Sequence, residues 1–203
     1  KQSSGKYSET LFIHCGGKQR MSKIALALRV LKIDVKLIPD IDVLNDEAIF
    51  KGIVEAFGID WPTIQSDYNT IVGNLHSPKE KINRNDAKTS INRIIDGSQN
   101  QDLSNQEIND IRTVIRTISK WETIKSAGKN AIPAGDATSA FRRLNETLQQ
   151  NGIHIVPVGE LECFIKDIGG HGSEWTNKVL EKYPNIDDPV YSQIREFMGN
   201  LNL

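Results

Sequence analysis

Short apolar runs alternate with a helical repeat in the first third of the chain. One run of strand composition covers residues 10–15 and a second covers residues 35–38. Between them, residues 18–31 carry apolar side chains at the three-and-four spacing of one buried helix face. Strand, helix and strand in this order predict parallel strands joined by a crossover helix. The expected fold class is therefore α/β, with a short parallel sheet and flanking helices.

A strand pattern returns late in the chain, in the apolar run at residues 153–158. The sequence at residues 61–150 is polar, rich in Lys and Asn, and helical in pattern. Within it, Ser104 and Glu107 predict a capping box at the start of a helix. We therefore expect three parts: residues 1–60 form the first part of the core, residues 61–150 form a large helical insertion, and residues 151–203 complete the core with two terminal helices.

Composition narrows the classes of partner. The formal charge is −1, so no overall field draws the chain to nucleic acid or to a membrane surface. No apolar run reaches the roughly 20 residues that span a bilayer. We expect a cytoplasmic protein without a membrane partner, in which Cys15 and Cys163 are reduced, buried thiols. Since the chain begins at Lys1 rather than Met, we also expect it to be part of a longer protein.

Two acidic pairs follow two of the expected strands. Asp40 and Asp42 come directly after the second strand, and Glu160 and Glu162 repeat this spacing after the late strand. Residues two apart in an extended segment share one face. Since ligands of open α/β sheets bind beyond the carboxyl ends of the strands, the four acids are expected to converge on one crevice.

A convergent group of carboxylates suits Mg²⁺ or Mn²⁺, which take oxygen ligands. Such ions polarise a phosphate and lower the pKa of an attacking water. Asp40, Asp42 and Glu162 are the expected metal ligands, and Glu160 is expected to assist catalysis. The alternative, that these acids are solvated turn residues, stays open.

Phosphate contacts are expected at a second place. Gly16, Gly17 and Lys18 begin a predicted helix, whose amino terminus favours anions. His171 lies in a Gly-Gly-His-Gly turn from which it can reach a phosphate. The segment is not a P-loop, because Gln19 stands in place of the metal-binding Ser or Thr. No ATP site is therefore expected in this chain.

The order of these motifs resembles a Toprim domain. A strand, a glycine turn and a helix precede Asp40-Ile41-Asp42, and Gly159-Glu160-Leu161-Glu162 follows late, as in the overcoming-lysogenization-defect (OLD) nucleases. The resemblance implies a Toprim-like, Rossmann-like fold and a magnesium- or manganese-dependent endonuclease that nicks or cleaves DNA, many relatives acting in antiphage defence. It also implies an amino-terminal ABC-type ATPase domain outside this chain, and a homo-oligomer formed through the parent protein. Lys178 is the candidate for the late lysine that stabilises developing negative charge.

One residue departs from the Toprim pattern. Cys15 stands where that pattern has a Glu, and a thiol does not replace a carboxylate toward magnesium. The alternative function is therefore a catalytically degenerate module that binds nucleic acid or a partner protein. A third hypothesis is a receiver-like or other flavodoxin-type regulatory domain, which the long helical middle argues against.

Overall fold

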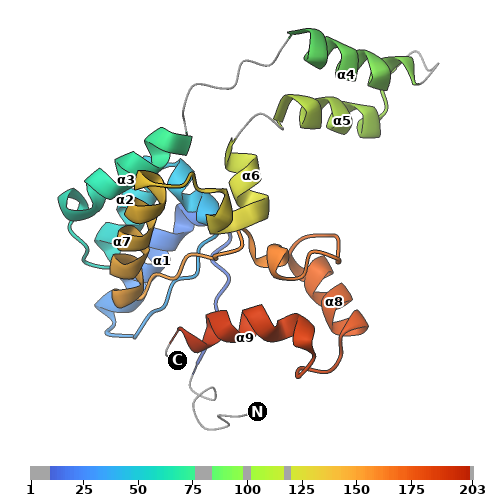
Figure 1. Cartoon of the computed structure of the whole chain (residues 1–203). Helices are drawn as coiled ribbons and strands as arrows, with labels where there is room; N and C mark the ends of the chain where they lie inside the picture. Colours follow the sequence, from blue (N-terminus) through green and yellow to red (C-terminus); the bar gives the residue numbers. More distant parts are fainter. Residues whose placement is uncertain (1–9, 76–83, 98–101, 117–119, 202–203) are drawn as a thin grey trace.

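Helices dominate the chain (Figure 1). The structure is a computed structural model that describes residues 10–75, 84–97, 102–116 and 120–201. Its α-helices are α1 (Lys18–Val30), α2 (Glu47–Ala56), α3 (Trp61–Leu75), α4 (Arg84–Asp96), α5 (Asn105–Arg116), α6 (Lys120–Ala127), α7 (Asp136–Gln150), α8 (Gly172–Lys182) and α9 (Ser192–Gly199). Short 3-10 turns are η2 (Ile41–Asn45), η3 (Gly128–Ala131), η4 (Leu161–Phe164) and η5 (Pro189–Tyr191). Within these ranges, none of the helices has both the length and the hydropathy to cross a bilayer.

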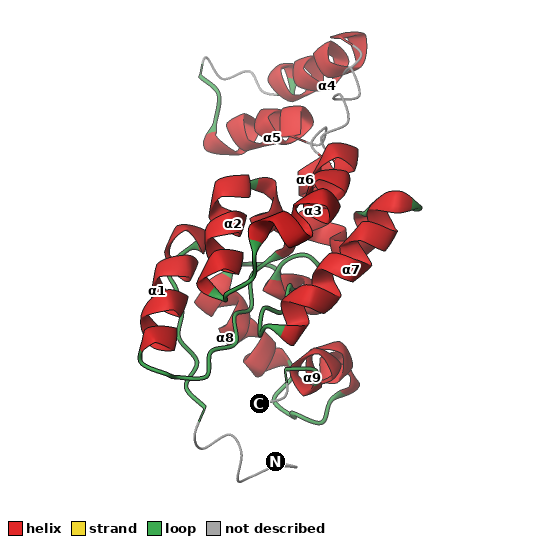
Figure 2. Ribbon diagram, turned by 90° about the vertical axis from the view of Figure 1, so that its left-hand side faces the viewer, coloured by secondary structure: helices red, strands yellow, loops and turns green. Residues whose placement is uncertain are grey.

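The expected α/β fold with a Toprim-like parallel sheet is wrong. The described residues form no β-strand, and their one isolated β-bridge joins Leu37 and Ile153 in parallel (Figure 2). The apolar run at residues 10–15 does not enter a sheet, and the side chains of Leu11, Phe12 and Ile13 are 80%, 63% and 51% exposed. An apolar composition does not by itself provide a neighbouring strand to pair with. Whether such a strand lies beside the segment depends on the tertiary structure.

Two of the expected strand segments nevertheless lie side by side. Segment 37–41 runs parallel to segment 152–159, and four backbone hydrogen bonds join them. They are Leu37 N–H to Gly152 O, His154 N–H to Leu37 O, Val156 N–H to Pro39 O and Ile41 N–H to Gly159 O, at 2.8, 2.8, 3.0 and 3.0 Å. We call this parallel pairing of the two segments the ladder; it is the part of the predicted sheet that forms. Both segments end at the same side of the molecule.

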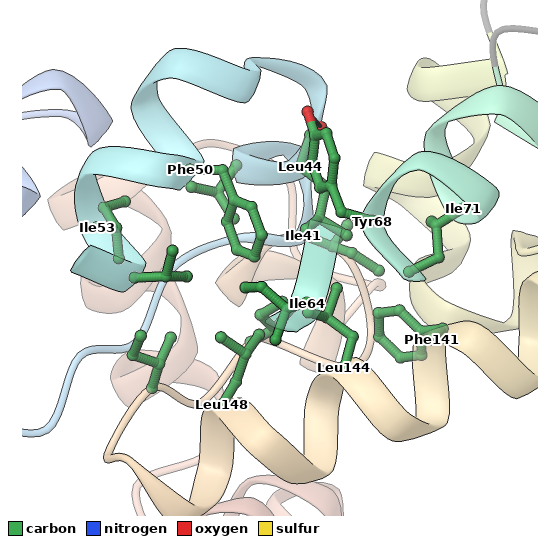
Figure 3. Close-up of a cluster of buried hydrophobic side chains, with 14 of the residues drawn as sticks. Ile41, Leu44, Phe50, Ile53, Ile64, Tyr68, Ile71, Phe141, Leu144 and Leu148 are labelled. Atoms are coloured by element: carbon green, nitrogen blue, oxygen red, sulfur yellow. Dashed lines mark hydrogen bonds between the residues drawn. The ribbon is translucent and has the colours of Figure 1, made fainter. Parts of the chain in front are cut away.

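The main core lies where α2, α3 and α7 pack around the ladder (Figure 3). One face of α7 supplies apolar residues at helical spacing, namely Ala137, Ala140, Phe141, Leu144 and Leu148, all buried. Phe50 of α2 stacks on Tyr68 of α3 with ring centroids 5.3 Å apart. The hydroxyl of Tyr68 donates to Leu44 O at 3.0 Å, so its polar end is satisfied. With Ile153, all three predicted parts of the chain contribute to this core.

A second core joins the last two helices to the end of the ladder. Its buried members are Val156, Phe164, Ile165, Trp175, Val179, Phe197 and Leu201. The rings of Phe164 and Phe197 lie 5.6 Å apart. The two terminal helices that the sequence predicts are confirmed, and their apolar faces anchor the segment that carries Glu160 and Glu162.

Helices α4 and α5 pack against each other, away from the main core in both views (Figures 1 and 2). The predicted capping box is confirmed at the start of α5. Ser104 N–H donates to Glu107 Oε2 at 2.6 Å, and Glu107 N–H donates to Ser104 Oγ at 3.2 Å. Local sequence therefore determines where this helix begins.

Replacing the buried His154 tests the packing of the ladder. This side chain is 3% exposed, and neither of its ring nitrogens has a hydrogen-bond partner. Burial, with a smaller contribution from Lys36, lowers its pKa below the ordinary 6.5, so the folded state takes up this proton at a lower pH than the unfolded chain does. The unfolded chain binds a proton first as the pH falls below that value, and stability is lost there.

We expect His154→Leu to match or exceed the wild type in stability near neutral pH, because it removes two unsatisfied polar atoms. Its advantage should grow by about 1 kcal/mol between about pH 7.5 and 5.5. Urea unfolding at both pH values measures this, with His14→Leu at an exposed position as the control. An advantage that is the same at both pH values contradicts the expectation.

Candidate functional site

The ladder brings the two acidic pairs together. The hydrogen bond from Ile41 N–H to Gly159 O is the last of the four, and Asp40, Asp42 and Glu160 flank it directly in the sequence. Asp42 lies in η2, and Glu162 lies in η4, so neither is on a strand. The predicted convergence of the acids therefore occurs at the end of a two-segment ladder rather than at the edge of a sheet.

The carboxyl group of Asp40 shows how close the acids are. The pKa of Asp40 is raised to about 6, from an ordinary value of 3.8. Burial is the largest cause, and the negative charges of Glu160, Asp42 and Glu162 add to it in that order, while a hydrogen bond from the backbone of Leu161 opposes them. At neutral pH four carboxylates thus share one region, which is unfavourable unless cations join them.

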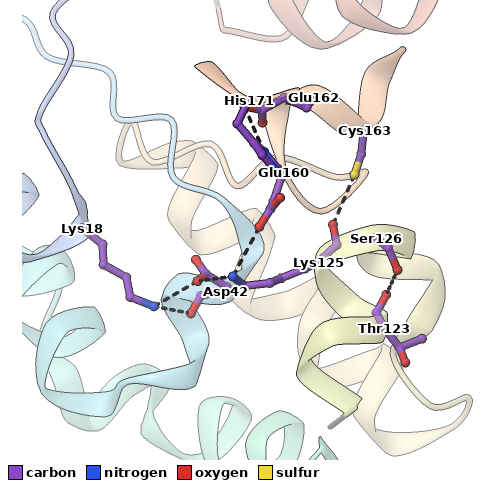
Figure 4. Close-up of polar contacts among 9 residues, drawn as sticks. All are labelled: Lys18, Asp42, Thr123, Lys125, Ser126, Glu160, Glu162, Cys163 and His171. Carbon is purple, nitrogen blue, oxygen red and sulfur yellow. Dashed lines mark hydrogen bonds and ion pairs between the residues drawn. The ribbon is translucent and has the colours of Figure 1, made fainter. Parts of the chain in front are cut away.

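Two lysines supply positive charge (Figure 4). Lys18 Nζ lies 3.1 Å from Asp42 Oδ2 and donates to Asp42 O at 3.2 Å. Lys125 Nζ lies 3.6 Å from Asp42 Oδ2 and 3.4 Å from Glu160 Oε1. The first lysine is at the amino end of α1, where a phosphate contact is predicted, and the second is on α6.

Glu162 and His171 form the other side of the cluster. His171 Nδ1 lies 3.7 Å from Glu162 Oε1, and Gly172 N–H donates to the same oxygen at 2.8 Å. Ligand atoms of Glu160, Glu162 and His171 all lie within 4.8 Å of one another, a separation that suits a metal ion. The structure places the imidazole of His171 beside Glu162, and the phosphate contact expected of this residue stays a prediction.

Lys125 is the site residue that sequence reasoning missed. It stands in a lysine-rich helical stretch with no pattern that separates it from its neighbours, and only the packing of α6 brings it to the acids. Gly159 makes this packing possible: its φ is +112°, and a Cβ there would overlap Lys125 O. The thiol of Cys163 also donates to Lys125 O, at 3.3 Å.

Within the described part of the chain, no hydrogen bond or ion pair joins the other predicted site residues to the four acids. Lys178 Nζ pairs with Glu174 Oε1 at 2.7 Å on the exposed surface of α8. Gly16 and Gly17 are exposed, with φ of +69° and +114°. Cys15 is partly buried against the main core, and burial raises the pKa of its thiol, which disfavours the thiolate that binds metals. Cys163 is likewise free and partly buried.

Comparisons with protein-family models, with curated proteins and with solved structures found no match to this chain. What the site can do therefore follows from its own residues.

Enlarging Gly159 tests whether the close approach of α6 holds the site together. We expect Gly159→Ala to lower the free energy of unfolding by about 2–4 kcal/mol, because its φ is unfavourable for alanine and the added Cβ has no space. The matched control is Gly135→Ala, whose φ of +96° is also positive but whose Cβ would meet nothing within 4 Å. Chemical denaturation compares the two, and equal losses contradict the close approach.

Neutralising Asp40 should stabilise the protein. The folded state binds a proton more tightly than the unfolded chain, so the ionised carboxylate costs stability above about pH 6. We expect Asp40→Asn to gain roughly 1–3 kcal/mol at about pH 7.5, and the gain to vanish as the pH falls toward 4. Denaturation curves across this range measure it. Asp187→Asn, at an exposed position, is the control and should change nothing.

Proposed function

We propose that the acidic cluster binds a divalent cation, Mg²⁺ or Mn²⁺, and serves the hydrolysis of phosphodiesters in DNA. The observation that carries the proposal is that the ladder brings the two acidic pairs to one place. There, burial and three neighbouring carboxylates raise the pKa of the Asp40 carboxyl to about 6. A protein that only needed to fold would gain stability by losing this charge. Arrangements that reduce stability in this way are concentrated at functional sites.

The residues present fit such an ion. Ligand atoms of Glu160, Glu162 and His171 lie within 4.8 Å of one another. The charges of Glu160, Asp42 and Glu162 act on the pKa of Asp40, which places the two aspartates nearby. Asp40, Asp42 and Glu162 would hold the ion through carboxylate oxygens, with Glu160 assisting. The bound ion would supply polarisation of the phosphate and a water of lowered pKa. With the ion in place the Asp40 carboxyl would stay ionised, because positive charge reverses the effect of its three neighbours.

The same residues provide positive charge for a phosphate. Lys18 and Lys125 contact the acids, whereas Lys178 pairs with Glu174. We propose that these two lysines stabilise negative charge on the reacting phosphate, the role that the sequence predicted for Lys178. An ammonium group does this as a point charge and needs no fixed orientation.

The wider setting is also part of the proposal. The motif resemblance to OLD-family nucleases supports DNA as the substrate, an amino-terminal ABC-type ATPase domain as a partner, assembly of further copies through the parent protein, and a role in antiphage defence. A Toprim sheet is not part of this proposal, because the described residues form no sheet. A cytoplasmic location, in keeping with two free cysteines, belongs to the same proposal.

The ion pairs favour a second candidate function. Lys18 and Lys125 already neutralise Asp42 and Glu160, and Cys15 stands where the nuclease pattern has a Glu. In this case the acids are structural partners of the lysines. The chain would then be a non-catalytic module that binds nucleic acid or a partner protein.

Manganese binding separates the two functions. Calorimetric titration with MnCl₂ should show binding at millimolar or lower concentration for the wild type, and at least tenfold weaker binding for Asp40→Asn, because the amide carries no charge. The same variant is expected to be more stable than the wild type. An acid with a purely structural role would not combine weaker metal binding with higher stability on replacement. Asp187→Asn should bind manganese like the wild type.

Cleavage of DNA in the presence of manganese is the second measurement. Asp42→Ala should lower the rate at least a hundredfold relative to the wild type, since it removes an expected ligand. Equal rates for the two proteins contradict the nuclease function. A wild type that binds no manganese at millimolar concentration supports the non-catalytic module.

A further inference from the structure

The ammonium of Lys125 lies between the two segments of the ladder. Its Nζ is 3.6 Å from Asp42 Oδ2, which belongs to the first segment's end, and 3.4 Å from Glu160 Oε1, which belongs to the second. A divalent ion held by Asp42 beside Glu160 would lie close to this position, because its oxygen ligands stand at about 2.0–2.6 Å. Both cations cannot occupy it, because like charges at such a distance repel strongly.

The backbone of Lys125 is held in place, whereas its side chain is long and partly exposed. Its carbonyl oxygen is held by the thiol of Cys163 and by the close approach of Gly159, so α6 stays against the acids. The side chain is 34% exposed and ends on a flexible four-carbon stem. The side chain of Lys18 is less exposed, at 25%. Of the two lysines, the more exposed Lys125 is thus the one suited to leave the carboxylates while its helix remains in place.

We propose that Lys125 is a built-in counter-ion of the proposed metal site: it neutralises Asp42 and Glu160 until a divalent ion displaces it, and it then binds the substrate phosphate. This inference rests on the proposed function. When the ammonium group is displaced, it loses its ion pairs with two carboxylates. A phosphate next to the ion is an anion with which it can form a new pair. Metal and phosphate should therefore favour each other's binding, so that the site holds the metal more tightly when substrate is present.

Removing the ammonium tests the first half of the proposal. In calorimetric titration with MnCl₂ alone, Lys125→Met should bind manganese about tenfold more tightly than the wild type, because the ion no longer competes with a resident cation. Lys125→Arg keeps the charge and should bind with wild-type affinity. Lys129→Met, at an exposed position on η3 in the next turn, is the matched control and should also bind like the wild type.

The second half concerns catalysis. At saturating manganese, Lys125→Met should cleave DNA at least tenfold more slowly than the wild type, although it binds the metal more tightly. Higher affinity with lower activity is not the result of a merely damaged fold. Lys125→Gln provides the same comparison if the methionine variant fails to fold, and far-ultraviolet circular dichroism of each variant shows which of them do.

The outcomes separate this inference from the function it rests on. If the wild type binds manganese and Lys125→Met binds it equally or more weakly, the counter-ion role is overturned while the metal site stands. If neither protein binds manganese, the metal site itself is overturned, and the counter-ion role with it. Unchanged cleavage by a tighter-binding Lys125→Met overturns the phosphate contact alone.

Discussion

The pairing of segment 37–41 with segment 152–159 is the constraint on which the rest of the structure depends. Four backbone hydrogen bonds join stretches that lie far apart in the sequence. The main core packs on one part of this ladder, and the second core begins at Val156 near its end. Because both segments run in the same direction, the residues that follow each of them meet at one place. The acidic site exists only because this ladder forms.

Stability and function oppose each other at that place. Four carboxylates gathered at the end of the ladder repel one another, and this repulsion adds to burial in raising the pKa of Asp40. Lys18 and Lys125 offset part of the cost from two different helices. A cation of higher charge would offset more, so the arrangement favours metal binding and at the same time makes the lysines its competitors.

Individual elements show how far the sequence predicts the fold. The helix predicted over residues 18–31 is confirmed as α1, with Ala25 buried on the expected face. Its periodic pattern is local, and so is the capping box of α5. The strand predicted at residues 10–15 is wrong, because a strand requires a neighbouring edge and no local pattern supplies one. The α/β class failed for the same reason, although two of the three predicted strand segments do lie side by side.

The sequence by itself determined the helices and the two acidic pairs, since helical periodicity and the spacing of Asp40 to Asp42 and of Glu160 to Glu162 are local properties. Only the tertiary structure decided that the pairs meet without a sheet, and that Lys125 rather than Lys178 contacts them. The physical reason is that a long-range contact depends on which surfaces pack. Here that depends on Gly159, where the absence of a side chain lets α6 approach the acids.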